Sequence, residues 1–257
     1  MNETFETILY EKKDAVATIT LNRPDRRNAF NTTMYRDLDQ ALGLAEEDKG
    51  VRAIILTGSG DKAFSAGADL DEHHFKNLGE SMEYISIDAK AFRRIENVPQ
   101  PVIAAVNGAA IGGGCKIAIV SDIAIASEKA IFSLPGARFG FVHTITLGRG
   151  REVLGRQRLA RMLLTGETID AGKAEAYGLV SQVVPHDQLM AEAEKVAEQI
   201  ASFPPLTTQV TKRMLHRGMD DDYRWEDLLS PGLLLMEDVQ EGLRAFDEKR
   251  KPKFEGK

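Results

Sequence analysis

The segment that most constrains the fold runs through residues 102–126, VIAAVNGAAIGGGCKIAIVSDIAIA. It is long and apolar enough to raise the question of a membrane span, which needs about 20 such residues. However, Lys116 and Asp122 lie inside it, and the glycine triplet at 112–114 would break a membrane helix midway. Charged side chains and a broken helix are both costly in a bilayer. The segment therefore predicts a buried strand, a tight glycine turn, a helix and a further strand.

Residues 54–70, IILTGSGDKAFSAGADL, follow the same plan: a buried strand runs into a turn of small residues and then into a helix. Small residues let a ligand approach the backbone, and the start of a helix leaves N–H groups unpaired. Two such turns that face one point could hold an oxyanion between two N–H donors. Alternatively, the glycines only permit close packing. Neither turn has the spacing of a dinucleotide fingerprint or a phosphate loop, so we set those functions aside.

Hydrophobic periodicity along the rest of the chain predicts an α/β fold. The first two thirds contain strands and helices, and Asn31 is expected to cap the first long helix. Beyond Leu147 the pattern is mostly helical, with Asp170 and Gly178 expected at the two ends of one helix. We therefore expect a core of strand–strand–helix units over residues 1–195 and a C-terminal helical oligomerisation region over residues 196–257. The expected strands are 15–21, 51–57, 102–108, 122–127, 130–133 and 179–184, and the expected helices include 31–49, 82–97, 149–164, 170–177, 187–202, 204–217 and 225–249.

Composition limits the partners of the chain. Its 257 residues carry a formal net charge of −6, which gives no overall attraction to nucleic acid or to an anionic membrane. Cys115 is the only cysteine, so an internal disulfide and a multi-cysteine metal site are excluded, and we expect its thiol to be inert. The first residues lack a positive region followed by an apolar run. No signal peptide is therefore expected, and the predicted location is cytoplasmic.

Several segments together resemble the crotonase superfamily, the enoyl-CoA hydratase/isomerase family. The matching segments are LNRPDRRNAFN (21–31), AFSAGADL (63–70), PVIAAVNGAAIGGGCKIAIVSDIAIASEKAIF (101–132), LLTGETIDAGKAEAYGLVSQVV (163–184) and EGLRAFDEKRKPKF (241–254). The resemblance implies a crotonase-like spiral of ββα units in two roughly perpendicular sheets, with C-terminal helices that pack homotrimers or hexamers. It also implies fatty acid metabolism, with an acyl-CoA thioester as substrate, coenzyme A as part of that substrate, and no separate cofactor or metal.

By the same resemblance, the backbone N–H groups of Ala66 and Gly113 hold the thioester oxygen. Removal of a substituent from the α-carbon of a thioester places negative charge on that oxygen. Preorganised N–H donors stabilise this charge, each typically by about 10²–10³ in rate. The coenzyme A contacts implied by the resemblance are Arg23, Arg26, Arg27, Asn28 and Lys62, together with the backbone of Ala66, Gly67, Ala68 and Asp69.

The chain departs from the family at the catalytic carboxylates. Hydratases of this family use two glutamates, and the corresponding positions here are Lys116 and Gly136. A third position, which is an aspartate in some isomerases and in a dehalogenase, is Thr144 here. A general acid or base has to be titratable and within hydrogen-bond reach of the substrate. Hydration by two glutamates is therefore not expected.

His143 and Lys116 remain as candidates for moving a proton. His73 and His74 follow DLDE and are expected on an exposed helix face; alternatively, one of them lies near the pocket. A lysine in place of a glutamate predicts a more cationic pocket, which suits a carboxyl-bearing acyl group. Alternatively, Lys116 forms a salt bridge within the helix layer. The residues expected to line the substrate pocket are Gly136, Arg138 and Thr144.

Three functions fit this pattern. The first is an acyl-CoA lyase or isomerase of the enoyl-CoA hydratase/isomerase type that stabilises a thioester enolate. The second is a decarboxylase or hydrolase of a carboxyl-bearing acyl-CoA, because decarboxylation forms an enolate without a base. The third is a catalytically silent module that binds coenzyme A esters, since all three usual carboxylates are replaced. Nucleic-acid binding is disfavoured by the net charge.

Overall fold

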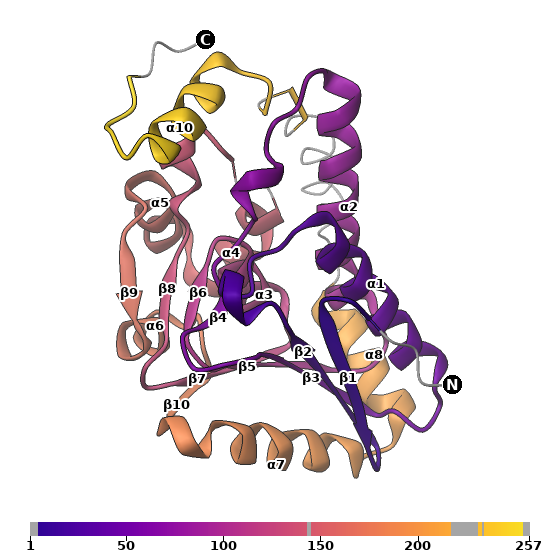
Figure 1. Cartoon of the computed structure of the whole chain (residues 1–257). Coiled ribbons are helices and arrows are strands. Elements are labelled where there is room, and N and C mark those ends of the chain that lie inside the picture. The colour runs from indigo at the N-terminus through magenta and orange to yellow at the C-terminus, as the bar shows by residue number, and fades with distance from the viewer. Residues whose placement is uncertain (1–4, 143–144, 217–230, 233, 254–257) are drawn as a thin grey trace.

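The computed structural model describes residues 5–142, 145–216, 231–232 and 234–253. Within these residues the strands form two sheets (Figure 1). The larger sheet has the order β1 (Ile8–Lys13), β2 (Val16–Leu21), β3 (Ala53–Gly58), β5 (Val102–Val106), β7 (Ile123–Ser127) and β10 (Gln182–Val184). The smaller sheet has the order β4 (Ala63–Ser65), β6 (Ala109–Ile111), β8 (Ile131–Ser133) and β9 (Thr168–Asp170). β1 is antiparallel to β2 and β9 to β8, and the other neighbours are parallel.

Consecutive strands alternate between the two sheets. β3, β5 and β7 lie in the larger sheet, and the strands that follow them along the chain, β4, β6 and β8, lie in the smaller one. The first two of these pairs continue into helices α2 (Leu78–Asn97) and α3 (Gly113–Val120). In Figure 1 the strands of the two sheets run in different directions. The predicted α/β class and the crotonase-like spiral of ββα units are therefore confirmed.

This alternation brings three distant segments to one edge of the smaller sheet. β4, β6 and β8 are parallel neighbours, so their carboxyl ends lie at the same edge. The chain leaves that edge through residues 66–69 after β4, through Gly112 before α3, and through the 3₁₀ helix η3 (Pro135–Phe139) after β8. The carboxyl ends of parallel strands are the usual place for a ligand in α/β proteins.

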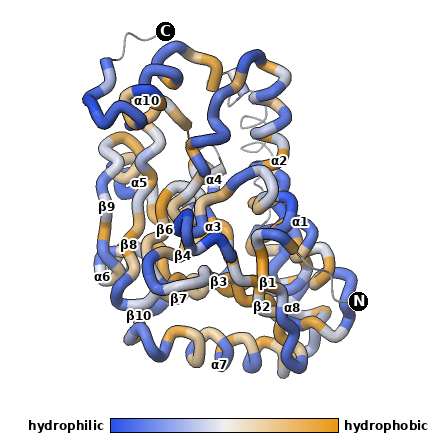
Figure 2. Tube along the Cα trace, viewed as in Figure 1, coloured by the Kyte–Doolittle hydropathy of each residue, from blue (hydrophilic) through white to orange (hydrophobic). Residues whose placement is uncertain are grey.

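Helix α7 (Leu189–Ala201) covers the outer face of the larger sheet (Figure 1). As a result β3 is buried on both faces: Ile54 and Leu56 belong to the main core, whereas Ile55 packs with Leu189 of α7. Hydrophobic and hydrophilic residues alternate along α7 (Figure 2), as expected for a helix with one buried side. Burial on both faces explains why the sequence of β3 is a continuous apolar run.

The capping residues predicted from the sequence mark the starts of two helices correctly. The Asn31 side chain accepts a hydrogen bond from the backbone N–H of Met34 at 2.9 Å and caps α1 (Thr32–Glu47). Asp170 caps α6 (Ala171–Tyr177) in the same way, through the N–H of Lys173 at 2.7 Å. The other helices are α4 (Ile145–Leu154), α5 (Arg156–Thr165), α8 (Pro205–Leu215), α10 (Glu237–Asp247) and the 3₁₀ helices η1 (Pro24–Arg26), η2 (Leu70–Glu72) and η4 (His186–Gln188). Among the described helices, none is long and apolar enough to cross a membrane.

Several predicted boundaries were wrong. The helix expected at 149–164 is two helices, α4 and α5, because Gly155 adopts a φ of +72° between them. Of the helix expected at 225–249, residues 225–230 lie outside the described residues, 231–232 are helical, and residues 234–236 form a turn before α10 begins at Glu237. Strands β1, β4, β6 and β9 were not predicted. The boundary expected at residue 195 lies within α7, which is continuous and packs on the larger sheet. The division into a core and an oligomerisation region stays a prediction.

Helix α10 packs on η3 of its own chain. Their backbones approach so closely that a Cβ built on Gly242 would lie 2.9 Å from the Cα of Phe139. The rings of Phe139 and Phe246 meet edge to face, with centroids 5.5 Å apart. The C-terminal helix is thereby held over the same edge of the smaller sheet as η3.

Five charged or ionisable side chains are buried together where α8 meets the core. Nζ of Lys212 lies 2.7 Å from Oδ2 of Asp122, and Nε2 of His216 lies 2.9 Å from Oδ1 of the same carboxylate. Arg149 joins the group through Glu96 at 2.9 Å and through Nδ1 of His216 at 2.7 Å. Burial alone would raise the pKa of Asp122, but hydrogen bonds from His216 and Lys212 outweigh it and lower the pKa.

Replacement of Asp122 by Asn is expected to destabilise the protein in a pH-dependent way. A carboxyl group whose pKa is lowered on folding adds stability that is present above its unfolded pKa, about 3.9, and is lost as the pH falls. Loss of one partner of a buried pair typically costs about 3–5 kcal/mol. Urea unfolding at pH 7 should therefore show a much lower free energy of unfolding for D122N than for the parent protein. The difference between these two free energies should become smaller below about pH 4.

Asp48, in an exposed pair with Lys12, is the control, and D48N should lower the free energy of unfolding much less. A difference for D122N that is constant with pH would contradict this account.

Candidate active site

A cavity of about 330 Å³ lies at the edge where β4, β6 and β8 end. Its wall contains residues 66–68 after β4, Gly112 and Gly113 at the start of α3, and four residues of η3. The remaining lining residues come from other parts of the chain: Tyr35, Leu70, His73, Tyr84, Ile85, Asp88, Ile111, Lys116, Phe141, Val142, Leu234 and Phe246. The topology alone therefore explains why the two glycine turns singled out in the sequence share one cavity.

The amide predicted as a donor at Ala66 is not available to a ligand. Its N–H donates to the carbonyl oxygen of Arg27 at 2.9 Å. Ala68 pairs with Phe30 as in a parallel sheet. The backbone N–H of Phe30 donates to the Gly67 carbonyl at 2.7 Å, and the Phe30 carbonyl accepts from the Asp69 N–H at 2.8 Å. Successive N–H groups of an extended chain point to opposite sides. The N–H of Ala68 therefore points away from this pairing, and no described residue accepts its hydrogen.

The amide of Gly113 is a free donor, as predicted. Gly113 is the first residue of α3, and the first N–H groups of a helix have no partner within it. The described part of the chain supplies no other acceptor for it. A Cβ built on Gly67 would lie 2.8 Å from the Ile111 carbonyl oxygen and 3.3 Å from the Gly113 nitrogen, and Gly67 has a φ of +91°. Only glycine fits there, and its presence brings the amides of Ala68 and Gly113 onto one wall.

Lys116 lines the cavity, but a carboxylate compensates its charge. Its Nζ lies 3.1 Å from Oδ2 of Asp88, and both side chains are buried. The interpretation of Lys116 as part of a salt bridge within the helix layer is confirmed, and the pair with Asp88 means that Lys116 itself adds no net positive charge to the cavity. Asp88 is a cavity residue that the sequence analysis missed. Its signal was a carboxylate on the buried face of α2, one helical turn from Tyr84 and from Phe92.

His73 is buried and lines the cavity, so for this residue the alternative near the pocket is correct and the exposed helix face is wrong. Its ring packs against Tyr84 and Phe141, with centroids 4.8 and 5.1 Å away. Nδ1 lies 3.1 Å from the carbonyl oxygen of Asp69. Because a carbonyl only accepts, Nδ1 carries the hydrogen. Burial lowers the pKa of His73, which keeps the ring neutral. His74 is exposed, as expected.

Burial also keeps two tyrosines and the cysteine neutral. The hydroxyl groups of Tyr35 and Tyr84 lie 3.4 Å apart in the cavity wall, and burial raises the pKa of both well above that of a free tyrosine. Burial raises the pKa of Cys115 to about 12, in agreement with an inert thiol. Within the described ranges, no group of three or more metal-ligating side chains is found.

Two of the residues predicted to line the substrate pocket, Gly136 and Arg138, do line the cavity. Nη2 of Arg138 donates to the carbonyl oxygen of Gly166 at 2.7 Å, which fixes the guanidinium beside η3. His143 and Thr144 lie outside the described residues, so their predicted roles stay predictions.

Three of the side chains predicted to contact coenzyme A are already engaged within the protein. Arg23 and Arg26 pair with the two oxygens of Asp69 at 3.0 and 3.1 Å. Burial alone would raise the pKa of Asp69, but hydrogen bonds from both arginines outweigh it and lower the pKa. Asn28 is fully buried, accepts a hydrogen bond from the Arg23 N–H at 3.0 Å and donates to the Ala63 carbonyl at 3.0 Å. Asn28 therefore shapes the turn.

Arg27 and Lys62 remain open to a ligand. Both side chains are exposed, and neither has a hydrogen bond or an ion pair with another described residue. The backbone of Gly67 and Ala68, also predicted to contact coenzyme A, lines the cavity. Of the two cations, Arg27 is tied to the cavity wall through its backbone carbonyl, which accepts the Ala66 N–H.

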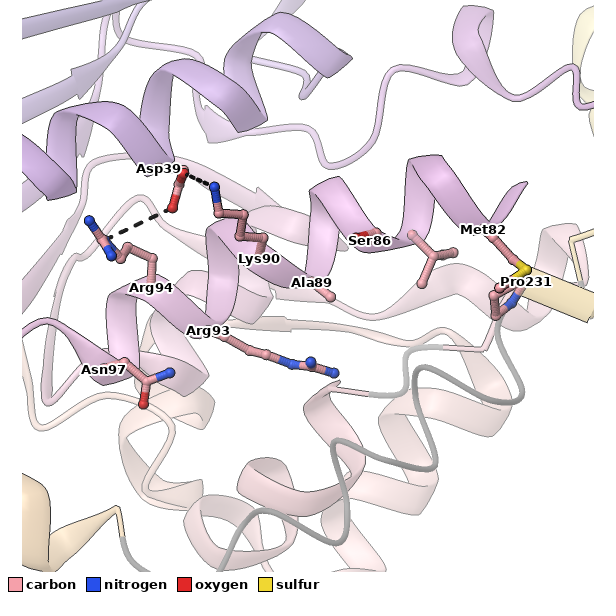
Figure 3. A pocket seen from close by; sticks show the side chains of 10 residues that line it. Asp39, Met82, Ser86, Ala89, Lys90, Arg93, Arg94, Asn97 and Pro231 are labelled. Atoms are coloured by element: carbon pink, nitrogen blue, oxygen red, sulfur yellow. Dashed lines mark ion pairs between the residues drawn. The ribbon is translucent and has the colours of Figure 1, made fainter. Parts of the chain in front are cut away.

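A second hollow, of about 510 Å³, lies on the outer face of α2 (Figure 3). Lys90 and Arg94 extend from α2 toward Asp39, with N···O distances of 2.8 and 3.9 Å. Arg94 also pairs with Glu46 at 3.2 Å. These cations are compensated by carboxylates, and neither glycine turn reaches this hollow. The cavity at the ends of β4, β6 and β8 is therefore the candidate site.

Comparison with known proteins agrees with this geometry. A family model described as enoyl-CoA hydratase/isomerase matches residues 11–257. The chain belongs to the enoyl-CoA hydratase/isomerase family. It is 40% identical over 264 residues to a probable enoyl-CoA hydratase of Rhizobium meliloti, with 98% of each chain covered. It is 38% identical over 257 residues to a short-chain-enoyl-CoA hydratase of Clostridium acetobutylicum, with 95% of each chain covered.

Solved structures of the enoyl-CoA hydratase/isomerase family have the same fold. An enoyl-CoA hydratase/isomerase from Xanthobacter autotrophicus superposes with a TM-score of 0.88 at 32% identity, covering 98% of this chain and all of the other. A carnitinyl-CoA hydratase from Mycobacterium avium superposes with a TM-score of 0.86 at 34% identity, covering 99% of this chain and all of the other. Sequence and fold thus agree on the family, and an acyl-CoA substrate is consistent with it.

Substitution of Gly67 by Ala should damage the site. The new Cβ would clash with the Ile111 carbonyl, and the positive φ would cost roughly 1–3 kcal/mol for a non-glycine residue. The loop is expected to move, so that the affinity for butyryl-CoA, measured by titration calorimetry, falls at least about tenfold. A Cβ built on Gly172 in α6 would make only an ordinary contact, 3.7 Å from Oδ1 of Asp170, and G172A is the matched control. An unchanged affinity for G67A would show that this contact does not position the site.

Proposed function

We propose that the protein is an acyl-CoA-thioester enzyme that stabilises a thioester enolate between the N–H groups of Ala68 and Gly113. The observation that carries the proposal is the meeting of two unpaired amides, from separate turns, in one cavity. Charge that develops on the thioester oxygen would be shared by both donors. Removal of one such donor typically costs about 10²–10³ in rate.

The reaction that we propose first is the addition of water to an α,β-unsaturated acyl-CoA, or a shift of its double bond. Names such as short-chain-enoyl-CoA hydratase and crotonyl-CoA hydratase among the relatives support this choice. The two-glutamate mechanism is not part of the proposal, because Lys116 and Gly136 hold those positions. Decarboxylation or hydrolysis of a carboxyl-bearing acyl-CoA is the second candidate, and Arg138 at the cavity wall is the observation that favours it.

Coenzyme A is proposed to bind as part of the substrate, with its phosphates near Arg27 and Lys62. These exposed cations have no described partner, whereas Arg23 and Arg26 already pair with Asp69. A cytoplasmic location and a role in fatty acid metabolism complete the proposal. The role in fatty acid metabolism rests on the enoyl-CoA thioesters that the names of the relatives give as substrates.

A panel of thioesters tests the proposed function. The purified protein is expected to hydrate crotonyl-CoA, followed as loss of the absorbance of its conjugated double bond, and to leave malonyl-CoA and methylmalonyl-CoA unchanged. Release of carbon dioxide from the malonyl esters with inert crotonyl-CoA would favour the decarboxylase. Tight binding of butyryl-CoA without turnover of any thioester would instead identify a catalytically silent binding module.

We also propose that the chain assembles with copies of itself through helix α8. Leu206, Val210 and Met214 recur at helical spacing and are 74, 59 and 58% exposed, and Phe203 and Leu215 lie nearby with 48 and 68% exposure. A contiguous apolar surface of this kind is typical of an interface. A homotrimer or a hexamer made of two trimers, as the resemblance implies, would cover it.

A charge within this surface should disrupt the assembly. The V210E variant is expected to run as a smaller species than the parent protein in size-exclusion chromatography with light scattering, because an unpaired carboxylate would be buried at the interface. Lys195 on the exposed side of α7 provides the control, K195E, which should assemble normally. A parent protein that is already monomeric, or a V210E variant of unchanged mass, would contradict the proposal.

A further inference from the structure

The cavity holds a buried carboxylate and a buried ammonium that enolate stabilisation by backbone amides does not use. Asp88 comes from α2 and Lys116 from α3, and Oδ2 and Nζ lie 3.1 Å apart. Their side chains are only 7 and 11% exposed, yet both residues line the cavity. If the pair served only to hold α2 against α3, apolar side chains would stabilise that contact at least as well. Its position in the cavity wall therefore points to a further role.

The pair lies beside the amide donor of Gly113. Lys116 follows Gly113 by three residues in α3, so both lie on one side of that helix. Both also approach the ring of Phe92: Nζ of Lys116 lies 4.8 Å from its centroid, and a Cβ built on Gly113 would lie 3.4 Å from its Cζ. A thioester whose oxygen is held at Gly113 therefore has its α- and β-carbons next to this pair.

Two other polar side chains of the cavity wall are engaged elsewhere. His73 uses Nδ1–H on the Asp69 carbonyl, and Arg138 uses Nη2 on the Gly166 carbonyl. The hydroxyl groups of Tyr35 and Tyr84 face each other, and both lie close enough to Asp88 for its charge to help raise their pKa. Asp88 and Lys116 are an acceptor and a donor of protons in direct contact with each other.

We propose that Asp88 and Lys116 are the acid–base pair that adds water across the double bond of an α,β-unsaturated acyl-CoA. The inference rests on the proposed function and names the side chains that move its protons. It places the carboxylate on α2, a different element from those that carry the two hydratase glutamates, and gives it a cation as partner.

The step balances without a cofactor. The Asp88 carboxylate takes a proton from a water molecule whose oxygen forms a bond to the β-carbon. The electrons of the double bond move onto the thioester oxygen, where Ala68 and Gly113 hold the enolate. The enolate then collapses and its α-carbon takes a proton from Lys116. A proton passes from Asp88 to Lys116 across their 3.1 Å contact and restores the starting charges. Nothing is oxidised or reduced.

Conservative substitutions test the pair. In D88N and in K116Q, kcat for crotonyl-CoA hydration is expected to fall by about 10²–10⁴, the usual contribution of general acid–base catalysis. The affinity for butyryl-CoA, which cannot be hydrated, should change less than threefold, because neither residue contacts coenzyme A. D88E should recover part of the lost rate. The control variants are D39N and K90Q, which break an ion pair of 2.8 Å on the outer face of the same helix and should keep full activity.

A double variant guards against misfolding. D88N/K116Q removes both charges together and leaves no unpaired ion, so it should fold even if a single variant does not. Two residues that act as one unit also give a non-additive result. The rate of the double variant is therefore expected to lie within a few fold of the slower single variant.

Two outcomes separate this inference from the proposed function. If the parent protein hydrates crotonyl-CoA and D88N, or the double variant, keeps more than a third of its kcat, the acid–base pair is overturned and the enolate site stands. If the parent protein binds butyryl-CoA but turns over no thioester, both proposals are overturned.

Discussion

The contact of Gly67 with the backbone from Ile111 to Gly113 is the constraint on which the site depends. The two segments follow β4 and β6, and these strands are neighbours only because the chain alternates between two sheets. At the contact, no side chain separates one backbone from the other. The amides of Ala68 and Gly113 are consequently placed by main-chain geometry. The side chains around them can differ between relatives without loss of the two donors.

Asp88 illustrates that freedom. The resemblance places the hydratase glutamates at Lys116 and Gly136, yet the cavity contains a carboxylate, supplied by α2. Lys116 lies 3.1 Å from that carboxylate, so the two side chains add no net charge to the cavity. Reading residue types at family positions alone would therefore misjudge both the charge of the cavity and its chemical groups.

The sequence predicted what depends on local chemistry. The Asn31 and Asp170 caps were correct because a cap needs only a side chain and an N–H group three residues away. The glycine turns were recognised because their residue types are unusual. Strands β4, β6 and β9 were missed because each is three residues long and exists through pairing with distant segments.

The errors within the site have the same origin. Ala66 and Ala68 are chemically alike, and only the contact with Arg27, in a different turn, decides which amide is free. The helical spacing of Asp88 indicates a buried carboxylate, but its place in the cavity depends on how α2 packs against α3, which the spacing does not specify. His73 was assigned to an exposed face because its neighbours in sequence are acidic, whereas in the fold its ring lies against Tyr84 and Phe141.

Leu234 and Phe246 line the cavity although they come from the last tenth of the chain, and α10 fixes Phe246 against η3. These two residues therefore help to set the volume of the cavity that an acyl chain could fill. Neither of them carries a group proposed to act on the thioester. Substitutions in α10 can therefore change the length of acyl chain that the cavity accepts without altering the two amide donors. Selectivity and reactivity then depend on different segments of the sequence.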